Sequence, residues 1–184
     1  GDNLSFSLGS DATHGSVTLD GSLATYTPDA NYNGDDSFTF SVSDGELSDT
    51  AEVTLSVSAV NDAPVLATVS NVSFDEDGSG STSLSGSDID GDALTFSITG
   101  GSDITATLDG SDVTFSAPAN YNGSEAFSVS VSDSEYSDSQ SITVTVNAVN
   151  DAPVAATGLS STTSEDQSVV VTLSGSDIDG DALI

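Results

Sequence analysis

Apolar and hydroxyl side chains alternate along much of the chain. Within residues 125–132 and 139–147, Phe, Ile or Val recurs at every second position, and Ser or Thr fills most positions between. A period of two places one row of side chains in a core and the other in water, which is typical of a β-strand. No segment shows the spacing of an amphipathic helix. The pattern therefore predicts an all-β protein.

Turn residues divide residues 61–148 into seven short strands. Gly, Asp, Asn and Pro separate the expected strands, which cover residues 65–74, 81–85, 93–99, 104–108, 113–116, 125–132 and 139–147. Seven strands in a segment of this length predict an immunoglobulin-like Greek-key β-sandwich. The residues expected to face its core are Phe74, Leu94, Phe96, Leu108, Phe115, Tyr121, Phe127, Val129, Val131, Ile142, Val144 and Val146.

The same sequence returns after 89 residues. Val-Asn-Asp-Ala-Pro-Val begins at positions 60 and 149, Asp-Ile-Asp-Gly-Asp-Ala-Leu at 88 and 177, and Asn-Tyr-Asn-Gly at 31 and 120. Such self-similarity indicates a tandem array. We expect residues 1–60 to be the C-terminal part of one repeat, residues 61–148 a complete repeat, and residues 149–184 the N-terminal part of the next. The chain is expected to be a window from a longer array.

The charge of the chain adds a requirement for folding, because the sequence contains 30 Asp and Glu residues and no Lys or Arg. Two carboxylates ~4 Å apart repel by about 1 kcal/mol in water and about 4 kcal/mol at a protein surface. Clustered acids therefore need cations from outside the chain, unless they form a solvated acidic surface. The lack of basic side chains disfavours binding to nucleic acid or to an anionic membrane. Without Cys, disulfides and Cys-bound zinc are excluded, and no apolar run is long enough to span a membrane.

The acids fall in loops at both ends of the expected sandwich. Asp88, Asp90 and Asp133 lie in loops at the end that faces the preceding repeat, whereas Glu76 and its two Asp neighbours lie at the opposite end. Stacked repeats would bring both groups together around the linker Asn-Asp. Carboxylate, amide and carbonyl oxygens in sets of about six to eight are the ligands that Ca²⁺ prefers.

In combination, these motifs resemble the cadherin-like tandem repeats of large bacterial surface and adhesin proteins. Besides the three recurring segments, the resemblance rests on Ser-Phe-Asp-Glu-Asp at 73–77, Ser-Glu-Asp at 164–166, and the Phe-rich strand that precedes Ser-Asp-Gly at 43–45. It implies calcium-binding junctions between the sandwiches. The ligands implied near residue 62 are Asn61, Asp62, Asp88, Asp90 and Asp133. Those implied near residue 151 are Glu76, Asn150, Asp151, Asp177 and Asp179.

The chain departs from the animal cadherin pattern at three places. Ala59 and Ala148 stand where an acid is expected, and Ala63 and Ala152 replace an Asn. An expected Asp-x-Glu segment is replaced by residues 118–123. We therefore expect fewer calcium ions in each junction.

The resemblance implies a secreted, extracellular or cell-surface protein. Its expected function is that of a calcium-rigidified spacer in a bacterial adhesin or surface fibre, with calcium ions and neighbouring repeats as partners. Two alternatives stay open: a module that binds surface glycans or identical chains, and a subunit of a self-assembling filament.

Catalysis is not expected. The acids lie in short Asp-Gly turns, and no Trp is present to hold a sugar against a carboxylate pair. His14 is the only imidazole and occupies a loop. The Asp-Ile-Asp-Gly-Asp segment is not an EF-hand, because its twelfth position is Thr99 instead of a bidentate Glu.

Overall fold

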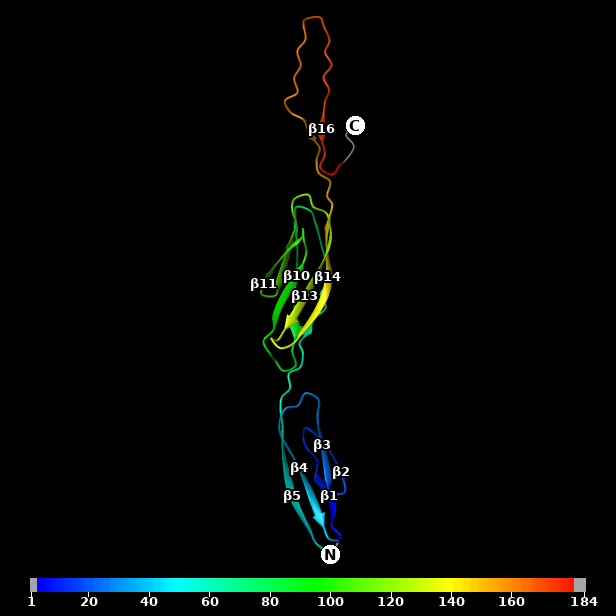
Figure 1. Cartoon of the computed structure of the whole chain (residues 1–184), viewed down its shortest axis with the longest axis vertical. Helices are drawn as coiled ribbons and strands as arrows, with labels where there is room; N and C mark the ends of the chain where they lie inside the picture. Colours follow the sequence, from blue (N-terminus) through cyan, green and yellow to red (C-terminus); the bar gives the residue numbers. More distant parts are fainter. Residues whose placement is uncertain (1–2, 181–184) are drawn as a thin grey trace. The chain divides into compact units, whose positions relative to one another are not determined.

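A computed structural model describes residues 3–180 and divides the chain into two compact units, residues 1–62 and 63–184 (Figure 1). Every regular element of the described residues is a β-strand, which confirms the all-β prediction. None of these residues belongs to a helix that could cross a membrane.

The first unit contains five strands. β1 (Ser5–Ser10), β4 (Gly34–Ser43) and β5 (Ser48–Val57) form an antiparallel sheet in the order β1-β4-β5. β2 (Gly15–Asp20) and β3 (Leu23–Pro28) form a separate hairpin. Only Val17 and Phe38 are buried among the apolar residues described in this unit.

The second unit contains a β-sandwich made by residues 63–148. Its strands are β6 (Val65–Leu66), β7 (Val72–Asp75), β8 (Ser79–Ser83), β9 (Gly86–Ser87), β10 (Thr95–Gly100), β11 (Thr105–Asp109), β12 (Asp112–Ser116), β13 (Gly123–Ser132) and β14 (Ser137–Asn147). One sheet has the order β10-β13-β14-β7, the other contains β11-β12-β8, and β6 pairs with β9. If β6 with β7, and β8 with β9, each count as one broken strand, the seven predicted strands are present.

The single strand predicted at residues 65–74 is wrong, because the segment is broken into β6 and β7. β6 pairs with β9, whereas β7 crosses to the other sheet and runs parallel to β14. Side chains satisfy the backbone at the crossing: Gln140 accepts the N–H of Val69 at 3.1 Å, and its own amide donates to the Val69 carbonyl at 2.5 Å. The alternation of apolar and polar residues along a strand indicates which side chains point inward, but it does not indicate which sheet each half of the strand joins.

The core agrees with the predicted inward set. Eight of those twelve residues are buried, and Leu94, Phe96, Leu108 and Tyr121 are half-buried and pack against them. Phe115 and Phe127 make an edge-on ring contact with centroids 5.3 Å apart. The core also includes five residues that the pattern did not single out: Leu66, Val69, Leu84, Ile104 and Val113.

Residues 149–180 carry two further short strands, β15 (Val154–Ala155) and β16 (Gly175–Ser176), which pair with each other. Between them, residues 156–174 form no strand. Most of their apolar side chains are exposed.

Candidate cation sites at the acidic ends of the sandwich

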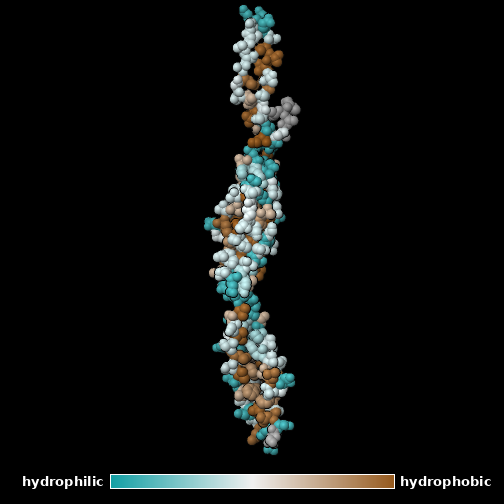
Figure 2. Space-filling view, in the orientation of Figure 1, coloured by the Kyte–Doolittle hydropathy of each residue, from teal (hydrophilic) through white to brown (hydrophobic). Residues whose placement is uncertain are grey.

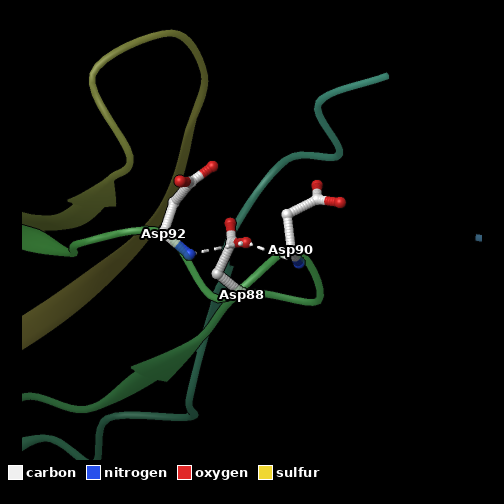
Figure 3. A group of neighbouring side chains, drawn as sticks. All are labelled: Asp88, Asp90 and Asp92. Atoms are coloured by element: carbon white, nitrogen blue, oxygen red, sulfur yellow. Dashed lines mark hydrogen bonds between the residues drawn. The ribbon is translucent and has the colours of Figure 1, made fainter. Parts of the chain in front are cut away.

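A tight acidic turn follows β9 (Figure 3). Asp88 Oδ1 accepts the backbone N–H groups of Asp90, Gly91 and Asp92, at 2.9, 3.1 and 3.3 Å. Gly91 has a φ of 82°, a left-handed conformation that glycine adopts without strain. The turn thus gathers three carboxylates on five consecutive residues.

These three carboxylates can converge on one small volume. Asp88, Asp90 and Asp92 each offer an oxygen within 4.8 Å of the others, and they form the one such group found among residues 3–180. Asp88 Oδ2 is buried and has no hydrogen-bond partner. Asp92 was not among the residues expected here, although its spacing of two from Asp90 was visible in the repeated motif.

A second group of acids surrounds the linker at residue 151, inside the second unit. The N–H of Val149 donates to Glu76 Oε1 at 2.5 Å, and the N–H of Asp151 donates to Asp179 Oδ2 at 2.6 Å. The structure therefore brings together Glu76, Asp151 and Asp179, three of the ligands implied by the resemblance. Asp177 shapes the adjacent turn, because its Oδ1 accepts the N–H of Asp179 at 3.0 Å.

Two oxygens in this second group are buried without a hydrogen-bond partner. They are Glu76 Oε2, on a side chain that is only 6% exposed, and Asp151 Oδ2. Burial raises the pKa of Asp151, and the negative charges of Asp179, Asp77, Glu76 and Asp177 raise it further. A buried carboxylate oxygen without a donor is costly, and this chain has no Lys or Arg to supply one.

Two contributors at this end were not predicted as site residues. Asp77 Oδ1 accepts the N–H of Asn120 at 3.2 Å, and Asp77 follows Glu76 directly in the acidic loop. Asn120 also lines a hollow of about 450 Å³ together with Asp151 and Asp177. Asn120 belongs to the segment that replaces the expected Asp-x-Glu, so that segment still places a polar residue beside the acids of this end.

The remaining expected ligands have different surroundings. Asn150 is exposed, and its amide donates to the carbonyl of Asp151 at 2.9 Å. Asp133 is buried and shapes a turn, because its Oδ1 accepts the N–H groups of Glu135 and Tyr136 at 2.7 and 2.6 Å. Asn61 and Asp62 are the last residues of the first unit. Their expected sharing of a cation with Asp88 stays a prediction.

Other acids already have donors in the protein. Glu125 accepts the Ser102 hydroxyl at 2.6 Å and three backbone N–H groups, and these bonds lower its pKa to about 2 despite the opposing effect of burial. At the equivalent place in the first unit, Asp36 accepts three backbone N–H groups and the Tyr26 hydroxyl. Burial opposes ionisation of Asp36, but these donors outweigh it and lower its pKa to about 2. Glu125 and Asp36 therefore hold loops and need no cation.

His14 takes part in the same loop of the first unit. Its side chain is exposed and stacks on Tyr32 with ring centroids 4.2 Å apart, while its backbone N–H donates to Asp36 Oδ2. This environment is consistent with the predicted loop position.

The chemistry of the unpartnered atoms fits a hard cation. Glu76, Asp151 and Asp88 present carboxylate oxygens only, without sulfur or imidazole nearby, and such oxygens suit Ca²⁺ better than softer transition metals. When bound, a cation would supply the positive charge that the sequence lacks.

The fold and the paired sheets define this chain as a set of immunoglobulin-like β-sandwich repeats. The model of the bacterial Ig domain family matches residues 1–56 and 61–147, and the chain belongs to that family. The predicted tandem immunoglobulin-like organisation is thus confirmed, whereas the cadherin-like features stay predictions.

Several solved structures are similar to the chain. An endo-fucoidan hydrolase of glycoside hydrolase family 107, MfFcnA4, is 25% identical over 81% of this chain and 24% of its own, with a TM-score of 0.37. Surface layer protein SbsC, domains 1–6, is 17% identical over 96% of this chain and 23% of its own, with a TM-score of 0.43. InvD of Yersinia pseudotuberculosis is 18% identical over 93% of this chain and 56% of its own, with a TM-score of 0.29.

The chain spans about a quarter of the length of the first two of these structures. No curated protein matches it.

Proposed function

We propose that this chain is a non-catalytic, calcium-rigidified spacer segment of a bacterial surface protein. The observation that carries the proposal is the group formed by Glu76, Asp151 and Asp179, where contacts join the end of one repeat to the start of the next. Two buried oxygens in this group lack any donor. Because the chain has no Lys or Arg, no basic side chain can balance the charge of these groups, and a cation from solution can.

In the proposed mechanism, a bound cation restricts the motion of the linker between two repeats. Residues 149–151 are too few to let adjacent repeats fold back, but unbridged they could still pivot. Glu76 lies just after β7 in the complete repeat, whereas Asp179 follows β16 in the next. A cation held by both sides removes the pivot, and it also relieves the repulsion among the acids.

Family membership and the acid distribution support an extracellular location. Extracellular Ca²⁺-binding modules have dissociation constants of about 10⁻⁴–10⁻³ M, so a site with few protein ligands can bind calcium tightly enough to work there. Calcium ions and neighbouring repeats are the proposed partners.

The experiment is thermal unfolding of the chain in millimolar calcium, in excess chelator, and in sodium chloride of equal ionic strength. Millimolar calcium is about 1–10 times such a dissociation constant, and it should therefore stabilise the native state by about 0.4–1.4 kcal/mol. Sodium chloride should stabilise the protein less, because it only screens the repulsion among the acids and does not place a coordinated divalent ion between them.

A matched pair of variants locates the effect. Glu76→Gln should lose part of the calcium response, whereas Glu52→Gln removes the same charge at an exposed position on β5 and should keep it. Identical melting in calcium and chelator would refute the proposal.

A further inference from the structure

The acidic loop between β7 and β8 is fixed to its surroundings at three points. The N–H of Glu76 donates to the carbonyl of Asn147, at the end of β14, at 2.9 Å. The carboxylate of Glu76 accepts the N–H of Val149, in the linker, at 2.5 Å. The third point is Asp77, whose Oδ1 accepts the N–H of Asn120 at 3.2 Å. Glu76 is therefore held from the strand end, from the linker and from its own neighbour in the loop.

Asn120 belongs to the segment between β12 and β13, and this segment is attached to the sandwich. Next to Asn120, Tyr121 packs against the hydrophobic core, and its N–H donates to the carbonyl of Pro118 at 3.2 Å. Asn120 also lines the hollow that contains Asp151. The bond between Asn120 and Asp77 thus connects the acidic loop to a part of the repeat whose position the core determines. Figure 2 shows strongly hydrophilic side chains gathered at both ends of the complete repeat.

Both ends of this bond have a left-handed backbone, and the corresponding positions of the other repeats have the same conformation. The φ angles are 61° at Asp77, 58° at Asn120, 62° at Asp166 and 58° at Asn31. Asp and Asn adopt this region more readily than most other residues with a side chain. Asp166 and Asn31 adopt it without a bond of this kind among the residues described. Local sequence therefore determines the two turns, and the bond joins turns of suitable shape.

The bond holds in place a carboxylate that is prepared for a cation. Glu76 is 6% exposed, and its Oε2 is buried without a hydrogen-bond partner. A buried polar oxygen without a donor is costly, so its position depends on neighbouring groups that hold it there. Outer partners that orient the ligands of a metal typically contribute about 10–100-fold to metal affinity.

We propose that Asp77 is a positioning residue for the cation site at this junction, an inference that rests on the proposed function. Asp77 holds the acidic loop against Asn120, and this keeps the Glu76 carboxylate at the linker. It acts by accepting a hydrogen bond and not by contributing charge. Its side chain is exposed, and its negative charge acts on Asp151, so that without a cation this charge adds to the repulsion at the junction.

Two substitutions at position 77 separate the hydrogen bond from the charge. Asp77→Asn removes the charge but keeps an oxygen that can accept the N–H of Asn120, and Asn tolerates the left-handed backbone. Asp77→Gly also tolerates this backbone, but it removes the acceptor. A residue that binds the cation directly would lose affinity in both variants, whereas a positioning residue would lose it only in the glycine variant.

The first measurement is a calcium titration of the full chain, followed by the backbone amide signals in nuclear magnetic resonance. The Val149 signal reports on the junction, and the Asp90 signal reports on the separate acidic turn after β9. At Val149, Asp77→Gly should raise the calcium concentration of half-change by about tenfold, whereas Asp77→Asn should leave it near the wild-type value. The Asp90 signal should respond alike in all three proteins.

Asp166→Gly is the matched control, because it changes the same residue type in the same backbone conformation one repeat later. It should leave the response of Val149 unchanged. Equal losses in Asp77→Gly and Asp77→Asn would overturn the proposal, because they would show that the charge matters and the bond does not. An unchanged response in Asp77→Gly would overturn it as well.

The second measurement is hydrogen exchange in excess chelator, which needs no cation. The N–H of Val149 should exchange faster in Asp77→Gly than in wild type and in Asp77→Asn, because the Glu76 carboxylate that accepts it is less firmly held. The N–H of Val129, in the core, should exchange alike in all three, which shows that the sandwich stays folded. Equal exchange of Val149 in wild type and Asp77→Gly would overturn the positioning role. A wild-type chain that binds no calcium would instead overturn the proposed function, whatever the exchange shows.

Discussion

Large and small side chains change places between corresponding positions of two repeats, and this difference allows a direct test of the packing in the sandwich core. At Gly80 an added Cβ would lie 2.7 Å from Phe74 Cδ1 and 2.8 Å from Val72 Cγ1, so a larger side chain has no room there. One repeat later, Val169 replaces Gly80, while Thr163 and Ser161 replace Phe74 and Val72. The larger residue at the first position thus accompanies smaller residues at the other two.

The exchange predicts energetic coupling between positions 80 and 74. Gly80→Val alone should destabilise the repeat by about 1–3 kcal/mol through overpacking. Phe74→Thr alone removes most of a side chain that is 8% exposed, and should cost about 3–5 kcal/mol. In the double variant the valine fills part of the space left by the ring, so its cost should fall short of the sum by about 1–3 kcal/mol.

The assay is urea unfolding of the full chain at fixed calcium, followed by far-UV circular dichroism, with the free energy extrapolated linearly. Ser81→Val is the matched control, because it adds bulk to the exposed face of the same strand and should change stability by less than about 0.5 kcal/mol. Additive costs in the double variant would refute the reasoning, since they would mean that the two side chains do not share one space.

Three further predictions concern the acids. Glu125→Gln should lower the melting temperature at neutral pH, and the difference in melting temperature from wild type should shrink as the pH falls from 4.5 toward about 2. The reason is that the pKa of Glu125 in the folded protein lies below its ordinary value of 4.5. The stabilisation by the Glu125 carboxylate is therefore complete above pH 4.5 and is lost as the pH falls toward about 2. A constant difference across that range would contradict this role. Asp90→Ala should weaken calcium binding measured by titration calorimetry while circular dichroism stays unchanged, because Asp90 is exposed in a turn that its backbone N–H maintains; global unfolding in saturating calcium would show a core role instead. In small-angle scattering of four tandem repeats, chelation should shorten the maximum dimension, and an unchanged dimension would argue against the pivot.

Local pattern was enough to predict the strands and their inward faces. Val129, Val144 and Val146 alternate with hydroxyl residues, and this period depends only on neighbours along the chain. The repeat length and the complete lack of Lys and Arg are likewise properties of the sequence itself, and they require that outside cations balance the acids. The tandem immunoglobulin-like class follows from these features.

The role of each acid was decided by tertiary structure. Glu76 and Glu125 are the same residue type near strand ends, but Glu125 meets N–H donors from residues 102–104, whereas Glu76 keeps one buried oxygen without a donor. Those donors lie more than twenty positions away in sequence, beyond the reach of local pattern. The break between β6 and β7 has the same origin, because the partners of the two halves, β9 and β14, lie on different sheets. Residue type specified which groups carry charge, and long-range packing determined which of them the protein itself satisfies.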